Sequence, residues 1–357
     1  MGALGRTRTD SRSLHLSNLL EPTALFGEIL AEVHADYRTW MQAGATRLRG
    51  ALSARYDLSP DRLLPTSGAL SGAAVVLQTF LRPGDAVLVE RPFYALLRDI
   101  AVQAGARVDF VSRSVSDGRI DPDEFAGQFR PETRVAIVTN PHNPGGHFLS
   151  DEDILSLAQI AERHDAILLV DEVYRDFDPA RRRAGAARLA GTIVGINSMS
   201  KTLGLPGLRC GWIDADPLMI ARLRVTQAST DFGISALGHA LAAAVFARND
   251  EFRAHAAALL EANRAVAIDW SNAMIERGLL ANGVPPSGGL YFPRLPTEPD
   301  TRALAIRAWN SEHLLIAPGE YFGAAGHIRI GMAGDSGALA AGLERLRRLL
   351  EGRERTA

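Results

Sequence analysis

The chain has 357 residues, of which 46% are hydrophobic, enough to bury the core of one large domain with a smaller one attached. Its 39 lysine and arginine residues nearly balance 41 aspartate and glutamate residues, so charge does not favour nucleic acid or an anionic membrane as a partner. No apolar run reaches the roughly 18 residues of a membrane span, and the single Cys210 excludes an internal disulfide and is typical of the reducing cytoplasm.

The first 43 residues are expected to form an N-terminal arm. Met1–Ser13 has several arginines, threonines and serines but no apolar stretch of signal-peptide length. A segment this short cannot bury a core alone, so we expect the rest of it to pack against the C-terminal part of the chain.

From residue 44 the pattern alternates between helical periods and short apolar runs. The runs Ala86–Val89, Val135–Val138 and Ala166–Val170 are continuous, as in strands that are covered on both faces. Helices are predicted between them at Ser71–Leu81 and Ser150–His164. The sequence therefore predicts an α/β fold with a mostly parallel, doubly wound sheet, where ligands bind at the carboxyl ends of the strands.

The pattern of helix and strand signals changes after the part of the sequence that is predicted to form the sheet. A long helix is predicted over Leu237–Glu276, followed by a loop at Asn282–Gly289 and mixed strand and helix signals. We therefore expect a large domain over residues 44–275 and a smaller α+β domain over residues 276–357.

One segment carries a candidate nucleophile. The strand-like run Gly191–Ile196 leads to Ser198, Ser200 and Lys201, and Arg209 follows eight residues after the lysine. Nearly every other cation in the chain is arginine, which cannot deprotonate, whereas a lysine can become neutral and attack a carbonyl. The two hydroxyl groups and the planar guanidinium suit a phosphate. A lysine beside a phosphate site is what a Schiff base to pyridoxal phosphate requires.

Small residues open the first helix of the predicted sheet. Backbone N–H groups at Ala69 and Leu70 have room to approach a phosphate there. Tyr94 follows the strand that ends near Glu90, where an aromatic ring can lie flat on a planar heteroaromatic group.

Two further segments follow predicted strands. Two Asn-Pro pairs place Asn143 in a rigid, irregular loop, and its neighbour His142 has no partner nearby in the sequence and is expected to be structural. Asp171 ends a buried strand and could pair with a protonated pyridine nitrogen, with Tyr174 three residues later.

As a set, these segments resemble the fold-type I pyridoxal-phosphate enzymes, specifically the aminotransferase class I/II family, from about residue 44 to about residue 335. The motifs Asn-Pro-x-Gly, Asp-x-x-Tyr and Ser-x-Ser-Lys-x7-Arg occur in the family's order. The resemblance implies pyridoxal 5′-phosphate as the cofactor and no metal. It implies the following roles: Lys201 as the Schiff-base lysine, Asp171 as the partner of the ring nitrogen, Asn143 and Tyr174 as partners of the ring O3′, Tyr94 as the stacking ring, and Ser198, Ser200, Arg209 and the backbone of Ala69 and Leu70 as phosphate ligands.

The resemblance extends to the substrate. Ala317–Gly323 followed by His327–Ile330 is similar to the family, and Arg329 would bind the substrate α-carboxylate beside Asn143. Relatives that act on phosphorylated substrates usually carry arginine where this chain has Ala317, so that substrate class is disfavoured.

Family members build each site at a dimer interface, so a homodimer is expected. Many supply a tyrosine to the partner's cofactor phosphate. At about that place this chain has Trp40, with Tyr37 three residues earlier, and the sequence does not choose between them. The segment Leu16–Leu20 lies where family members often contact the substrate.

The leading function is an aminotransferase that acts on an amino acid and a 2-oxo acid. For this reaction Lys201 would have to be unprotonated near neutral pH, which requires a pKa well below the roughly 10.4 of a free lysine. Elimination, cyclisation or decarboxylation of an amino acid uses the same motifs and stays open. A cofactor-binding sensor domain of a transcription regulator is disfavoured, because the roughly 43 residues before the large domain are too few for a DNA-binding module.

Overall fold

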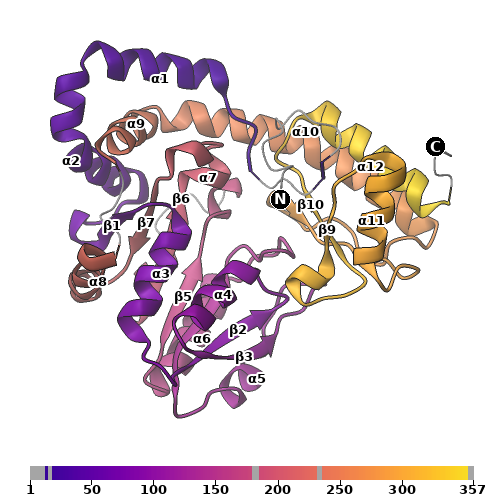
Figure 1. Ribbon diagram of the computed structural model, residues 1–357, viewed down its shortest axis with the longest axis horizontal. Helices are drawn as coiled ribbons and strands as arrows, with labels where there is room; N and C mark the ends of the chain where they lie inside the picture. Colours follow the sequence, from indigo (N-terminus) through magenta and orange to yellow (C-terminus); the bar gives the residue numbers. More distant parts are fainter. Residues whose placement is uncertain (1–12, 15–17, 179–184, 231–234, 353–357) are drawn as a thin grey trace.

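The computed structural model describes residues 13–14, 18–178, 185–230 and 235–352. Within these ranges the chain forms a large part on a seven-stranded sheet and a smaller part on a three-stranded sheet. Helix α10 (Asn249–Glu276) extends from the one to the other (Figure 1). None of the helices in these ranges is long and apolar enough to cross a bilayer.

The large sheet is mostly parallel, as predicted. Its strands lie in the order β1-β7-β6-β5-β4-β2-β3, and β7 alone among them runs antiparallel to its neighbours. The three continuous apolar runs of the sequence form β2, β4 and β5. The strands are β1 (Leu63–Thr66), β2 (Ala86–Arg91), β3 (Arg107–Ser112), β4 (Thr133–Thr139), β5 (Ile167–Asp171), β6 (Ile193–Ser198) and β7 (Gly211–Asp214).

Two apolar cores cover the two faces of this sheet. Successive strand residues point to opposite faces, so Val87 and Val89 join one core while Leu88 joins the other. The first core is covered by α3 (Ala69–Phe80), α4 (Ala95–Gln103) and α8 (Pro217–Thr230). The second is covered by α5 (Pro122–Gly127) and α6 (Asp151–Arg163).

A third core joins the N-terminal helices to the large part. Helices α1 (Thr23–Ala35) and α2 (Tyr37–Tyr56) pack on α9 (Ala236–Ala247). In contrast, the backbone of Leu14 donates to the carbonyl of Leu315 in the smaller part, at 3.0 Å. The apolar faces of α1 and α2 are thus buried on the large part, and α2 runs across residue 43.

The smaller part is α+β. Its sheet has the order β8-β10-β9 with antiparallel pairs, and its core includes the second half of α10. Its elements are β8 (Leu290–Tyr291), α11 (Thr301–Glu312), β9 (Ala317–Pro318), β10 (Ile328–Gly331) and α12 (Ser336–Leu350).

The long helix predicted over Leu237–Glu276 is two helices. Arg248 has φ −109° and ψ 25°, and its N–H bonds to Phe246 and Val245 instead of continuing the i to i−4 pattern. A new helix begins at Asn249, and its acidic first turn suits the positive end of the α10 dipole. The helical hydrophobic period does not show this corner, so the sequence pattern merged the two.

Candidate functional site

A pocket of about 190 Å³ lies at the carboxyl ends of the strands of the large sheet. We call it the strand-end pocket. It receives Asp171 from the end of β5 and Ser198 from the end of β6. Every residue that the sequence predicted to bind a cofactor lines it, namely Ala69, Leu70, Tyr94, Asn143, Asp171, Tyr174, Ser198, Ser200, Lys201 and Arg209.

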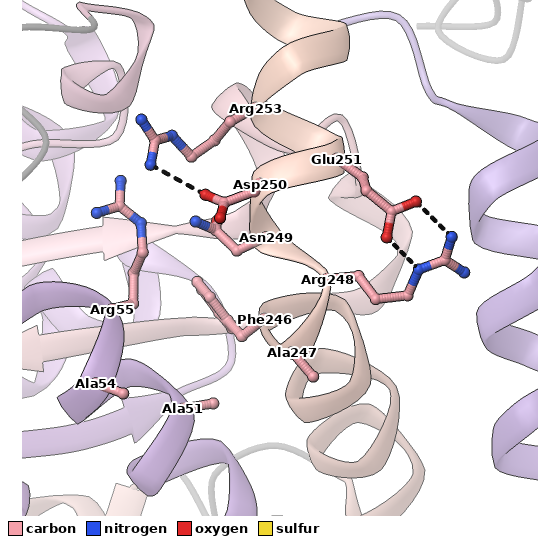
Figure 2. Close-up of a pocket in the computed structure, with 10 residues that line it drawn as sticks. All are labelled: Ala51, Ala54, Arg55, Phe246, Ala247, Arg248, Asn249, Asp250, Glu251 and Arg253. Atoms are coloured by element: carbon pink, nitrogen blue, oxygen red, sulfur yellow. Dashed lines mark hydrogen bonds and ion pairs between the residues drawn. The ribbon is translucent and has the colours of Figure 1, made fainter.

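A larger hollow lies elsewhere, between α2 and the corner where α9 meets α10 (Figure 2). Its volume is about 690 Å³. The charged side chains around it are paired: Arg253 with Asp250 at 3.5 Å, Arg248 with Glu251 at 2.6 Å, and Arg55 with Asp176 at 3.2 Å. Size therefore does not mark the functional site here, and the chemistry gathers in the smaller pocket.

Lys201 lies in α7 (Met199–Thr202), the short helix that follows β6. Its Nζ donates to Asn18 Oδ1 at 2.7 Å and lies 5.5 Å from the centre of the Tyr174 ring. Lys201 is the only lysine in the sequence. The chain therefore has one lysine side-chain amine, and it lines the strand-end pocket, a signal that was available in the sequence.

Asp171 is the buried acid of the pocket. Its side chain accepts from the backbone N–H of Val173 at 3.1 Å. Burial raises the pKa of Asp171 to about 7, against the opposing effects of that hydrogen bond and of Lys201. A buried carboxylate with one hydrogen bond is poorly compensated, so it is suited to a cationic partner that enters the pocket.

The N-terminus of α3 forms one end of the pocket. The helix begins at Ala69, two residues earlier than predicted, because Gly68 turns the chain with φ 94° and ψ 167°. The Arg209 guanidinium fills the space where a side chain at Gly68 would lie: a Cβ there would be 2.7 Å from Arg209 Nη2. The donors for an anion thus converge at one place: the backbone N–H groups of Ala69 and Leu70, the hydroxyl groups of Ser198 and Ser200, and the Arg209 guanidinium.

Gly211 makes this convergence possible. A Cβ at Gly211 would lie 2.8 Å from the backbone nitrogen of Ala69 and 2.6 Å from the carbonyl carbon of Gly68. Only a glycine lets β7 approach the start of α3 so closely. This requirement could not be predicted from the sequence, because it depends on the close approach of two segments that are far apart in the chain.

Asn143 and Arg329 meet across the two parts of the molecule. Arg329 Nη1 donates to Asn143 Oδ1 at 3.0 Å, and the guanidinium carbon lies 4.9 Å from the centre of the Phe322 ring. A guanidinium only donates, so the amide oxygen faces it and Nδ2 remains as the donor group of Asn143. Arg329 is thereby brought next to the strand-end pocket.

Tyr94 and His142 differ in their surroundings. Tyr94 lines the pocket, and burial, with smaller effects of Tyr174 and Asp171, raises its pKa to about 12, so the phenol stays protonated. His142 is fully buried, with Nε2 2.8 Å from the carbonyl of Pro92. Burial and the nearby Arg113 hold the pKa of His142 well below its usual range, so the structural role predicted for this histidine is supported.

The pocket also contains three residues that the sequence analysis did not single out: Asn18, Val173 and Pro206. Asn18 belongs to the segment that was expected to contact the substrate, of which Leu16 and Ser17 lie outside the described residues. Backbone contacts place it: Leu19 N–H donates to the carbonyl of Lys201 at 2.9 Å.

This set of donors fits pyridoxal 5′-phosphate. The anion cradle at α3 matches a phosphate, the buried acid a pyridinium nitrogen, the Asn143 amide donor a phenolate oxygen, and the single amine an aldehyde. No group present in the pocket opposes such a ligand.

Comparison with known proteins agrees with the geometry. The profile of the family described as aminotransferase class I and II matches residues 31–346. The arginine–pyruvate transaminase AruH of Pseudomonas aeruginosa is 30% identical over 284 residues, which cover 76% of this chain and 70% of that protein.

Two solved structures share the fold along almost the whole chain. A PLP-dependent aminotransferase of Streptococcus suis has a TM-score of 0.85 at 24% identity and covers 98% of this chain and 96% of its own. The PLP-dependent cyclase OrfR has a TM-score of 0.82 at 28% identity and covers 96% of this chain and 93% of its own. The chain therefore belongs to the aminotransferase class I and II family and is a pyridoxal 5′-phosphate-dependent enzyme of that family.

Proposed function

We propose that this enzyme transfers an amino group between an amino acid and a 2-oxo acid, with Lys201 as the residue that binds the cofactor covalently. The observation that carries the proposal is the strand-end pocket itself, where the only lysine of the chain lies among a buried acid, an amide donor and an anion cradle. Lys201, Asp171 and Asn143 come from three separate segments, which follow or end β6, β5 and β4, so their convergence is not a consequence of one local motif.

The proposed roles follow the positions in the pocket. Arg209, Ser198, Ser200 and the backbone of Ala69 and Leu70 would hold the phosphate, and Tyr94 would stack on the ring. Asp171 would hold the ring nitrogen protonated, while Asn143 and Tyr174 would donate to the phenolic oxygen.

The bound cofactor supplies an electron sink for negative charge at the substrate Cα. Lys201 Nζ would remove the proton from that carbon, since it is the only side-chain amine of the chain and lines the pocket. In the structure this amine is directed by the Asn18 amide oxygen at 2.7 Å. Arg329, held against Asn143, would bind the substrate carboxylate through its guanidinium.

A second candidate is cyclisation of an amino acid. Similarity to the cyclase OrfR at 28% identity over nearly the whole chain favours it. Both reactions would use Lys201 and Asp171 in the same way, and they differ in whether a 2-oxo acid is consumed.

The proposal includes a homodimer in the cytoplasm. Trp40 is 7% exposed and is buried in its own chain, with Arg47 over its ring at 4.4 Å, whereas Tyr37 is 57% exposed. Tyr37 is therefore the better candidate to reach a partner's cofactor phosphate.

The lone Cys210, a buried free thiol, supports a reducing compartment. The division into residues 1–43, 44–275 and 276–357 also stays a proposal, supported at its second boundary by the end of α10 at Glu276.

The test combines covalent capture with product analysis. After borohydride reduction with pyridoxal 5′-phosphate, the intact mass of the wild type should increase by one cofactor, and that of Lys201→Ala should not. The proposal fails if the wild type shows no increase or if both proteins show the same one.

The loaded enzyme is then incubated with a panel of amino acids, with and without 2-oxoglutarate, and the products are identified by mass spectrometry. Aminotransfer predicts a new 2-oxo acid and glutamate only when 2-oxoglutarate is present. A product formed in its absence, with no amino group transferred, would favour cyclisation.

A further inference from the structure

A buried ion pair lies behind the strand-end pocket. Glu90, near the end of β2, is 2% exposed, and Arg113, just after β3, has a side chain that is 0% exposed. Arg113 Nη1 and Glu90 Oε2 are 2.7 Å apart. Such a pair costs more in desolvation than it returns unless its other donors and acceptors are satisfied.

Arg113 satisfies its donors by joining two loops. Its Nε donates to the carbonyl of Gly118 at 2.7 Å, Nη1 to the carbonyl of Thr139 at 2.6 Å, and Nη2 to the carbonyl of His147 at 3.2 Å. The loop between Thr139 and His147 contains Asn143. One guanidinium therefore holds both ends of the loop that carries a pocket residue.

Glu90 acts on the same loop through a hydroxyl group. Its Oε1 accepts from the backbone N–H of Thr139 at 2.7 Å and from Thr139 Oγ1 at 2.6 Å. Thr139 Oγ1 in turn accepts from the backbone N–H of Asn143 at 2.8 Å. The hydroxyl has one hydrogen, which goes to the carboxylate, so its lone pair is directed to Asn143.

The chain of contacts ends in the site. It runs from Arg113 to Glu90, through Thr139 to the backbone of Asn143, whose side chain then accepts from Arg329. We propose that Glu90 and Arg113 are positioning residues, which act through Thr139 to hold Asn143 in the strand-end pocket. This inference rests on the proposed function, in which Asn143 contacts the cofactor.

A role in stability alone explains the geometry less well. Buried ion pairs can be replaced by apolar side chains with little loss of stability, so stability does not by itself require this pair. Here Glu90 and Arg113 both bind the ends of one irregular loop: Glu90 accepts twice from Thr139, and Arg113 donates to the carbonyls of Thr139 and His147. Backbone groups satisfy the N–H groups of Asn140, His142 and Gly146, whereas the N–H of Asn143 is satisfied by the Thr139 side chain.

The test removes the connecting hydroxyl group and leaves the charges. Thr139→Val keeps the shape of the side chain but breaks the link between Glu90 and Asn143. The matched control is Thr133→Val, since Thr133 lies at the other end of β4, is also buried, and also accepts one backbone N–H, from Arg130 at 3.0 Å. Thr139→Ser restores the hydroxyl group.

Two readouts are measured. In the cofactor-free protein, Thr139→Val should speed amide hydrogen exchange within residues 140–147 by about tenfold, since a buried N–H loses its acceptor. In the loaded protein, cofactor affinity should fall by about fivefold to tenfold, with a changed cofactor absorption spectrum. Thr139→Ser should return both to wild type, and Thr133→Val should change neither. If Thr139→Val does not fold, Thr139→Ala removes the same hydroxyl group.

The proposal is overturned if Thr139→Val changes loop exchange and the cofactor spectrum no more than Thr133→Val does. It is also overturned if loop exchange rises while cofactor affinity and spectrum stay the same, because Asn143 would then not depend on its anchor. Failure of the proposed function is seen separately, in a wild-type protein that gains no cofactor mass on borohydride reduction.

Discussion

Asp171→Asn should change the pH dependence of stability in the cofactor-free protein. Burial raises the pKa of Asp171 from 3.8 to about 7, so between these values the folded chain holds a proton that the unfolded chain has lost. Stability then falls as the pH rises through this window, by about 1.4 kcal/mol per pH unit. Between about pH 5 and about pH 7 the loss amounts to about 3 kcal/mol, and it saturates above the folded pKa.

The asparagine side chain does not titrate in this range, so the variant lacks this loss of stability. Relative to wild type, Asp171→Asn should therefore become more stable by about 3 kcal/mol between about pH 5 and about pH 8. The measurement is the free energy of unfolding in urea at both pH values, without cofactor. Burial also raises the pKa of Glu172 to about 7 and that of Asp214 to about 6, but these groups are present in both proteins, so their effects cancel.

The exposed Asp269→Asn is the matched control and should show no such difference. Parallel pH curves for wild type and Asp171→Asn would refute the reasoning. Saturating pyridoxal 5′-phosphate should stabilise the wild type more than Asp171→Asn at about pH 8, because the ionised Asp171 would then pair with the ring nitrogen of the ligand. An equal gain in stability for both proteins would mean that Asp171 does not contact that nitrogen.

Three further variants test phosphate binding and the assembly. Arg209→Gln should weaken cofactor binding about tenfold to a hundredfold, since charge-assisted hydrogen bonds to the phosphate are lost, while turnover at saturating cofactor changes much less. A spectral titration measures the affinity, and an activity assay measures the turnover. An unchanged affinity would exclude the phosphate role. Tyr37→Phe should weaken cofactor binding by about fivefold in a dimer, whereas Trp40→Phe should mainly lower the free energy of unfolding, by about 1–2 kcal/mol. The reverse pattern would make Trp40 the residue that reaches the partner.

The elements were predictable where the signal was local. Continuous apolar runs identified β2, β4 and β5, because a strand covered on both faces has no polar side to display. The corner at Arg248 was missed, because two helices in sequence have the same period as one. The start of α3 was misplaced by two residues, since Gly68 was not recognised as the turn.

The pocket residues were predictable for a related reason. Asp171 and Ser198 end strands, and parallel strands bring their carboxyl ends to one edge, so the predicted strand ends indicated where the pocket lies. The contact between Lys201 and Asn18 was not predictable, because 183 residues separate the two and neither has a motif that names the other.

The burial of Glu90 was not predictable from the sequence. Glu90 follows the apolar run Ala86–Val89, and no pattern in the sequence indicates that its carboxylate is buried. Burial of a carboxylate demands a cation and further donors, but the demand does not identify them. The structure supplies Arg113, 23 residues away, and Thr139, 49 residues away. Motifs mark the groups that touch a ligand, whereas the groups that hold them are found by asking how each buried charge is satisfied.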